Sequence, residues 1–280
     1  MNPFQNKSEY VISTWMFETF DLKKALQAIA NKGFNNIELW GDTVHFDPRA
    51  GLSTDNIKFW VQQYGLNIHS AHAPFRNFFN HSLDHHNDDM EFLRYRMGLW
   101  YETINRCEEL RIPILVMHAM NRREYPYTLS DVKIVKETLE NLCDYAGSRG
   151  VTIALENIPD NNPVLENDIS CTIKNQKTLF NLSNMKFCLD IGHVPLTGAD
   201  IFNEIDAAGN KLVSFHVHNN NGLIDSHDLP NTGILNWSEI YKYAREKGYL
   251  GEFVIEVYGG KDPEKKLNEV AALFNDTQQG

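Results

Sequence analysis

Nine histidine, aspartate and glutamate residues stand out because each lies at or just beyond the end of a short apolar run. They are His72, His118, Glu156, Asp190, His193, His216, Asp225, His227 and Glu256. Imidazole and carboxylate donors without cysteine thiolates suit Zn²⁺, Mn²⁺, Fe²⁺ or Co²⁺. One histidine in such a position is more often an ordinary hydrogen-bonded residue than a ligand. The prediction of a metal site therefore depends on the whole set.

Three of these carboxylates directly follow apolar residues. Glu156 ends the run ALE, Asp190 ends the run FCLD and Glu256 ends the run VIE. A buried carboxylate without a partner is costly, because water no longer solvates its charge. Each of the three therefore needs a cation, and we expect them to meet at one metal centre.

The chain alternates short β-branched apolar runs with longer amphipathic runs eight times. Strands are expected at 9–15, 36–41, 67–73, 113–119, 151–158, 185–193, 212–219 and 252–258. Helices are expected near 21–32, 54–64, 88–110, 129–148, 172–182, 199–207, 237–247 and 263–274. Near-continuous apolar strands separated by helices indicate a parallel sheet covered by helices. Eight such units predict an α/β protein with a closed (β/α)8 TIM barrel, whose working residues lie at the carboxyl ends of its strands.

Local signals support these units. Asp21, Ser53 and Ser130 are suitable residues to begin helices. Glycines suited to helix ends precede expected strands at Gly33, Gly65, Gly150 and Gly248. The alternative, a doubly wound open sheet, would place a glycine-rich phosphate loop after the first strand, but the segment TWMFETFD there has no glycine. No linker divides the chain, so residues 1–280 are predicted to form a single metal-dependent domain, with the aromatic loop 74–87 as a lid.

Composition excludes several classes of protein. The chain has 280 residues, with 26 Lys and Arg against 37 Asp and Glu, and a formal net charge of −11. This acidic balance argues against nucleic acid or an anionic membrane as a partner. No apolar stretch approaches the roughly 18 residues of a membrane-spanning helix, and no secretory signal begins the chain, so a cytoplasmic location is expected. The four cysteines are widely spaced and are predicted to be core thiols.

Four segments resemble the xylose-isomerase-like TIM barrel superfamily, which includes sugar and sugar-phosphate isomerases and epimerases and also abasic-site endonucleases of the endonuclease IV type. These segments are ALENIP (154–159), FCLDIGHVPLTGAD (187–200), FHVHNNNGLIDSH (215–227) and FVIEV (253–257). The resemblance spans expected strands three to eight. It implies that Glu156, Asp190, His216 and Glu256 hold a divalent metal ion (Mn, Zn, Co, Fe or Mg). It also implies that Glu156 and Glu256 move a proton next to a substrate carbonyl, with His193 beside the substrate.

The endonuclease branch of this superfamily has a larger metal cluster. Its additional positions are filled here by His72, His118, Asp225 and His227, so one to three metal ions per chain are implied, and paired zinc ions suit phosphoester hydrolysis. Two features favour the metabolic branch instead: the run HVHNNNG differs from the HLND-type run of the endonucleases, and the ending 233–237 (GILNW) resembles that of sugar-isomerase-like proteins. We therefore expect an isomerase or epimerase of carbohydrate metabolism. The main alternative is a phosphoesterase, followed by lyase or dehydratase chemistry, or a barrel that binds without catalysis.

Other polar and aromatic residues near the expected strand ends have two interpretations each. His218 either supports the metal ligands or contacts substrate, and Trp15 and Trp40 either stack on a sugar face or close the barrel. Arg122 either contacts a phosphate or belongs to a solvated charge pair, and Glu38 either binds a substrate hydroxyl or faces a helix. The expected substrate is small and polyhydroxylated or phosphorylated, and a homo-oligomer is compatible with the sequence.

Overall fold

The computed structural model describes residues 3–42, 44–75, 90–119, 129–159 and 172–275. Within them, eight parallel strands close into a barrel in chain order, with β1 beside both β2 and β8. The strands are β1 (Tyr10–Ser13), β2 (Asn36–Leu39), β3 (Asn67–His72), β4 (Ile114–His118), β5 (Thr152–Glu156), β6 (Lys186–Asp190), β7 (Leu212–Val217) and β8 (Phe253–Ile255). The predicted (β/α)8 TIM barrel is confirmed.

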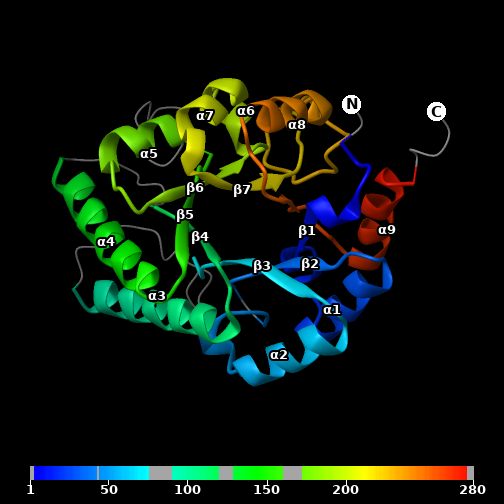
Figure 1. The fold of residues 1–280 in the computed structure, drawn as a ribbon, viewed down its shortest axis with the longest axis horizontal. Coiled ribbons are helices and arrows are strands. Elements are labelled where there is room, and N and C mark those ends of the chain that lie inside the picture. Colours follow the sequence, from blue (N-terminus) through cyan, green and yellow to red (C-terminus); the bar gives the residue numbers. More distant parts are fainter. Residues whose placement is uncertain (1–2, 43, 76–89, 120–128, 160–171, 276–280) are drawn as a thin grey trace.

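Helices surround the strands and cover the outside of the barrel (Figure 1). They are α1 (Leu22–Asn31), α2 (Thr54–Gln63), α3 (Met90–Leu110), α4 (Leu129–Gly147), α5 (Ile173–Phe180), α6 (His193–Leu196), α7 (Ile201–Ala208), α8 (Trp237–Glu246) and α9 (Pro263–Leu273). The red α9 lies near the blue N-terminal elements, where pairing of β1 with β8 closes the sheet (Figure 1).

The first helix shows how the sequence specifies each unit. The Asp21 carboxylate accepts a hydrogen bond from the Lys24 amide at 2.9 Å, which satisfies one of the free N–H groups at the start of α1. Every third or fourth residue, from Leu22 to Ile29, is buried against the barrel. After α1 the chain turns at Gly33 with φ of +75°, a conformation that side chains disfavour.

The strands are shorter than the apolar runs that predicted them. Trp15 lies in a short 3-10 helix (Thr14–Phe17), His193 begins α6, and Glu256 is one residue beyond β8. The apolar pattern continues past the sheet because the residues at the mouth of the barrel are buried as well. The apolar pattern therefore predicted which residues are buried, but the hydrogen bonds between strands end a few residues before the buried segment does.

The barrel interior contains small side chains below a polar layer. Val116, Ala154 and Cys188 form a buried cluster on β4, β5 and β6. Alternation along the strands places His118, Glu156 and Asp190 on the same inward face, two residues nearer the carboxyl ends. The register pairs His118 with Glu156, whereas Glu156 pairs with Cys188 and Asp190 lies two residues further along β6. All three polar side chains thus lie at the carboxyl ends of their strands, at the mouth of the barrel.

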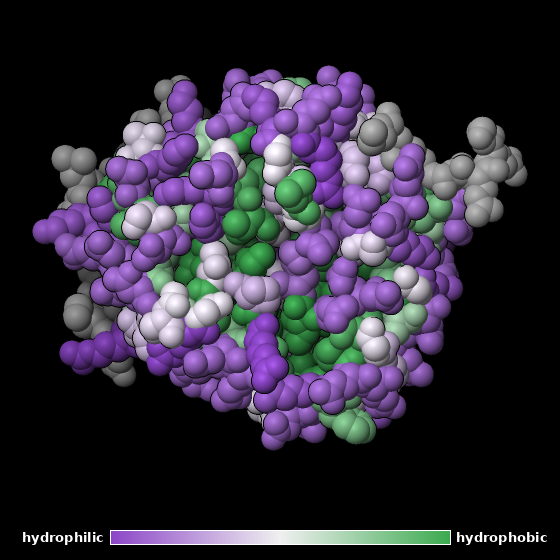
Figure 2. All heavy atoms as spheres, in the orientation of Figure 1, coloured by the Kyte–Doolittle hydropathy of each residue, from purple (hydrophilic) through white to green (hydrophobic). Residues whose placement is uncertain are grey.

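One face of the molecule is mostly hydrophilic (Figure 2). Figure 2 shows hydrophilic residues over most of one face, with hydrophobic residues visible mainly near its centre. Among the helices that the structure describes, none has the length and apolar character needed to cross a membrane. Cys107, Cys143 and Cys188 are buried free thiols, as predicted, and Cys171 lies outside the described residues. Most of the predicted lid, 74–87, also lies outside them.

The aromatic cluster between the sheet and α8 is expected to contribute strongly to stability. Phe253 is fully buried and its ring lies 5.0 Å from Trp237 and 5.2 Å from Tyr241, centroid to centroid. Phe253→Ala should lower the free energy of unfolding by about 3–5 kcal/mol, because it leaves a cavity in the core. Phe59→Ala is the matched control, since Phe59 is 62% exposed. Equal losses in urea denaturation would contradict this view of the core.

Candidate metal centre

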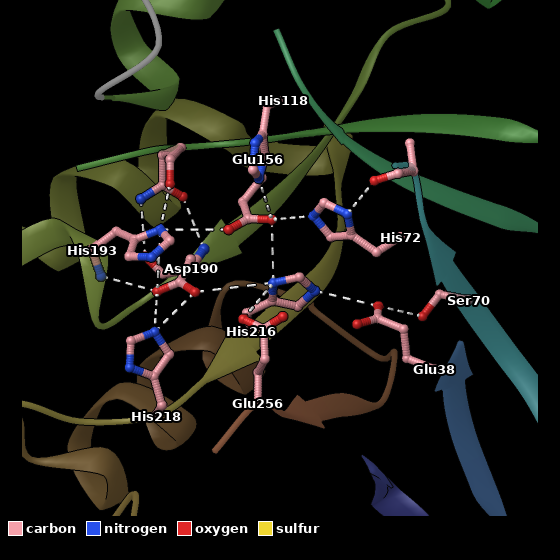
Figure 3. Close-up of polar contacts among 12 residues, drawn as sticks. Glu38, Ser70, His72, His118, Glu156, Asp190, His193, His216, His218 and Glu256 are labelled. Atoms are coloured by element: carbon pink, nitrogen blue, oxygen red, sulfur yellow. Dashed lines mark hydrogen bonds and ion pairs between the residues drawn. The ribbon is translucent and has the colours of Figure 1, made fainter. Parts of the chain in front are cut away.

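All nine predicted ligands lie in described residues, and the structure brings them together at the carboxyl ends of the strands. Figure 3 shows the central part of this cluster, with side chains from β3 to β7 and from the residue after β8 pointing toward one another. Donor atoms lie within 4.8 Å of one another in each of three groups. The groups are Glu156, Asp190, His216 and Glu256; His72, His118 and Glu156; and His193, His218, Asp225 and His227.

The Glu156 carboxylate connects two of these groups. Its Oε2 atom lies 3.2 Å from His72 Nε2, 3.7 Å from His118 Nε2 and 3.3 Å from His216 Nδ1. Its Oε1 atom lies 3.4 Å from His193 Nδ1. The register pairs His118 directly with Glu156 across β4 and β5, so the sheet itself sets this contact. One buried carboxylate therefore has imidazoles around both of its oxygens.

His216 shows that the first group fits a metal ion. Its Nδ1 atom is buried and has no hydrogen-bond partner, yet it lies 3.2 Å from a Glu256 oxygen and 3.3 Å from a Glu156 oxygen. An Asp190 oxygen lies 4.0 Å away. A buried nitrogen without a hydrogen bond, facing three carboxylates, matches the imidazole and carboxylate donors that hold divalent cations.

The third group lies on the other side of Asp190. Asp225 contacts two rings, with His193 Nε2 at 3.2 Å and His227 Nε2 at 3.3 Å. His218 donates from Nε2 to Asp190 at 2.8 Å, and its ring stacks on that of His227 at 3.6 Å. His227 has φ of +47°, which is uncommon for a residue with a side chain. The loop therefore holds His227 in a strained conformation to bring its ring into this group.

Backbone carbonyls fix the orientation of three cluster histidines. The Nδ1 atoms of His72, His193 and His227 donate to the carbonyls of Ala73, Asn157 and Glu256 at 2.7, 2.8 and 2.8 Å. A ring held in this way keeps its proton on Nδ1 and directs Nε2 toward the cluster. These bonds leave Nε2 available as a metal ligand.

Without a cation, the cluster balances its charge with protons. Burial disfavours charged histidine, but the hydrogen bond and charge of Glu156 raise the pKa of His72 to about 9. Asp190 and Asp225 likewise raise the pKa of His193 to about 10 against the effect of burial. Burial tends to raise the pKa of Glu156, but the positive charge of His216 holds it well below its ordinary range. A bound metal would displace protons from these histidines.

Aromatic residues line one side of the centre. The half-buried Trp15 ring lies 4.5 Å from the His227 ring and 5.5 Å from Trp40. Phe75 lies 4.9 Å from the His118 ring and 5.3 Å from Trp40. The predicted substrate contact Trp15 is thus beside the ligands. Arg122 lies outside the described residues.

Sequence reasoning missed several residues that support the ligands. The Asn157 side chain accepts from the Asp190 amide at 2.8 Å and donates to the Asp190 carbonyl at 2.9 Å. A Cβ atom on Gly192 would lie 2.0 Å from His218 Cε1, so only glycine leaves room for this ring. Glu38 was expected to bind a hydroxyl or face a helix; it instead contacts His216 inside the barrel. The only sign of Asn157 in the sequence was that this polar residue directly follows Glu156 in the otherwise apolar run ALENIP.

Comparisons with known proteins identify the family and the fold. A family model described as "Xylose isomerase-like TIM barrel" matches residues 26–277. Fructoselysine 3-epimerase of Shigella flexneri is 22% identical over 242 residues, which cover 84% of this chain and 85% of that protein.

Two solved structures share the fold. The IOLI protein with a bound zinc atom superposes with a TM-score of 0.77 at 18% identity, over 95% of this chain and 96% of that chain. An AP endonuclease, family 2, from Brucella melitensis superposes with a TM-score of 0.74 at 15% identity, over 94% of this chain and 98% of that chain. At these identities the likeness establishes the fold.

The metal-free protein is expected to lose stability as the pH rises from about 6.5 to about 10. The pKa values of His72 and His193 rise on folding to about 9 and about 10. Their stabilising contribution is therefore full below the unfolded pKa and is lost as the pH passes the folded values. Bound zinc takes the place of these protons, so the zinc-loaded protein should depend less on pH.

Thermal unfolding of chelator-treated and zinc-loaded protein across this range measures the difference. His193→Gln should flatten the curve of the metal-free protein, which separates the contribution of the cluster from that of other groups. A metal-free unfolding midpoint that stays constant or rises with pH would contradict the assignment of protons.

Proposed function

This chain belongs to the xylose isomerase-like TIM barrel family, and on that premise we propose that it is a divalent-metal-dependent sugar or sugar-phosphate isomerase or epimerase. The observation that carries the proposal is the pair Glu156 and Glu256, whose buried carboxylates lie 3.3 and 3.2 Å from His216 Nδ1. The relative from Shigella flexneri, a fructoselysine 3-epimerase, supports the epimerase class.

Glu156, Asp190, His216 and Glu256 would hold the cation of this enzyme, since their donor atoms converge within 4.8 Å. The bound ion, one of Mn, Zn, Co, Fe or Mg, would polarise the substrate carbonyl and stabilise the negative charge that follows proton removal. We assign the metal-dependent unit to residues 1–280 as a single domain.

The protein's own residues carry out two proton transfers. One glutamate, as the carboxylate, removes the proton from the carbon next to the carbonyl and keeps it, and the other, as the carboxylic acid, gives its own proton to the opposite face of that carbon. In the metal-loaded enzyme the cation itself would favour the unprotonated carboxylate of Glu156, despite the opposing effect of burial. Glu156 is therefore ready to accept the proton, and Glu256 is assigned the return step.

The surrounding residues suit a small polyhydroxylated substrate. Trp15 presents an aromatic face beside His227, and His193 and His218 lie close to Asp190 and Asp225 with imidazole groups that can bind hydroxyls. We assign Trp15, His193, His218 and Arg122 to substrate binding. A net charge of −11 favours a small molecule over nucleic acid.

A second candidate function is metal-dependent phosphoester hydrolysis of the endonuclease IV type. The observation that favours it is the presence of all three donor groups, which could hold two or three zinc ions. Paired metals stabilise both the attacking and the leaving oxygen in phosphoester hydrolysis. In this function His72, His118, His193, Asp225 and His227 would also be metal ligands.

The two-carboxylate mechanism predicts that Glu156→Gln and Glu256→Gln each slow proton exchange by at least about 100-fold. Manganese-loaded protein is incubated in D₂O with a panel of ketoses and ketose phosphates. NMR then measures deuterium incorporation next to the carbonyl, a reaction that either carboxylate loss should impair. Glu252→Gln is the control, because Glu252 lies at the opposite end of β8 and pairs with His69 at 3.4 Å. Full exchange in both variants would show the mechanism to be wrong.

The two candidate functions differ in their effect on an abasic DNA duplex. At low salt and micromolar zinc-loaded enzyme, we expect no incision. Incision that His227→Ala abolishes would instead favour the phosphoesterase, because His227 belongs to the third donor group. Gel electrophoresis of an end-labelled duplex measures the outcome, with an intact duplex as the control substrate.

A further inference from the structure

Glu38 is a buried carboxylate directly behind the metal centre. It lies in β2, is fully buried, and accepts a hydrogen bond from Ser70 Oγ at 2.7 Å. The same oxygen lies 3.3 Å from His216 Nε2, so the ring N–H donates to it. Figure 3 shows Glu38 and Ser70 on one side of His216, and Glu156 and Asp190 on the other. Glu38 therefore contacts a predicted metal ligand from the side away from the metal.

His216 is anchored differently from three other histidines of the cluster. His72, His193 and His227 donate from Nδ1 to backbone carbonyls and direct Nε2 inward. His216 donates from Nε2 and directs Nδ1 inward. Residue 216 lies within β7, and the backbone N–H and C=O groups of β7 are hydrogen-bonded to the neighbouring strands β6 and β8. A side chain must therefore supply the acceptor, and Glu38 does so.

Packing alone does not account for a carboxylate at this position. The Glu38 Oε1 atom is buried without a hydrogen-bond partner, which is an unfavourable state for an ionised group. An apolar side chain of similar size would fill the same space without this cost. What the carboxylate adds is a charged acceptor aimed at one nitrogen of His216.

We propose that Glu38 is a positioning residue for the metal centre: it holds His216 in the tautomer with the proton on Nε2, so that the Nδ1 lone pair faces Glu156, Asp190 and Glu256. This inference rests on the metal site of the proposed function. A carboxylate behind a ligating imidazole both fixes its orientation and makes it a stronger donor. Ser70 fixes the carboxylate in turn through its hydroxyl.

Zinc affinity, measured by competition with a chromogenic chelator, tests the proposal without any substrate. Glu38→Met removes the acceptor and should weaken binding of the most tightly held zinc by about 10- to 100-fold. Glu38→Gln keeps an acceptor oxygen but no charge, so its affinity should be intermediate. Glu204→Gln is the matched control, because Glu204 is a buried carboxylate in α7 that accepts a hydrogen bond from the Ile173 amide at 2.6 Å. Its zinc affinity should equal that of the wild type.

The tautomer supplies a second readout that a purely structural role would not change. Long-range ¹H–¹⁵N spectra of histidine-labelled protein distinguish protonated from metal-bound ring nitrogens, and His216→Gln assigns the His216 signals. Wild-type protein loaded with zinc should show His216 bound through Nδ1 and protonated at Nε2. In zinc-loaded Glu38→Met the signal of His216 bound through Nδ1 should weaken or disappear. Circular dichroism of each variant verifies that the barrel is folded.

The outcomes separate this inference from the proposed reaction. Wild-type zinc affinity in a folded Glu38→Met, with His216 still bound through Nδ1, would overturn the positioning role. Absence of zinc binding in the wild type would overturn it as well. Reduced affinity in the variant, together with no conversion of any sugar by the wild type, would support Glu38 as a positioning residue and contradict the proposed epimerase.

Discussion

The buried carboxylate of Glu156 is the group on which the rest of the centre depends. It is 2% exposed, and such a charge is stable only if cations or hydrogen-bond donors surround it. His72, His118 and His216 face one of its oxygens, and His193 faces the other. These rings come from different elements of the barrel. Because the Glu156 carboxylate needs all of these partners, its contacts join the ends of several strands.

The fold meets this requirement by fixing the orientation of four of the imidazole rings through hydrogen bonds to their outer nitrogens. A ring can direct one nitrogen at the centre only if something behind it holds the other nitrogen. Loop and strand-end carbonyls do this for His72, His193 and His227, whereas the buried carboxylate of Glu38 does it for His216. The cluster of histidines and carboxylates therefore extends one layer outward, and that layer includes the backbone of the loops that follow the strands.

The sequence predicted where the candidate ligands lie, because their position at the strand ends follows from periodicity. Once Glu156, Asp190 and His216 are placed at the ends of consecutive parallel strands, barrel closure alone brings them together. Glu38 could not be assigned in the same way, because its contact with His216 joins β2 to β7 across the barrel interior, and no local pattern reports such a pairing. The orientation of each imidazole was equally inaccessible, since it depends on a hydrogen bond to a backbone carbonyl. The strand ends were overestimated at Trp15 and His193 because burial continues beyond the sheet.

The proposed function requires that Glu156, Asp190, His216 and Glu256 hold a divalent metal ion. Anomalous diffraction at the absorption edge of the bound metal tests it most directly, on crystals of protein purified without chelators and supplied with zinc or manganese. We expect a peak between these four side chains, with His216 bound through Nδ1. Further peaks at the other two donor groups would show a multinuclear centre. An ordered barrel mouth without a peak at the four residues would contradict the claim.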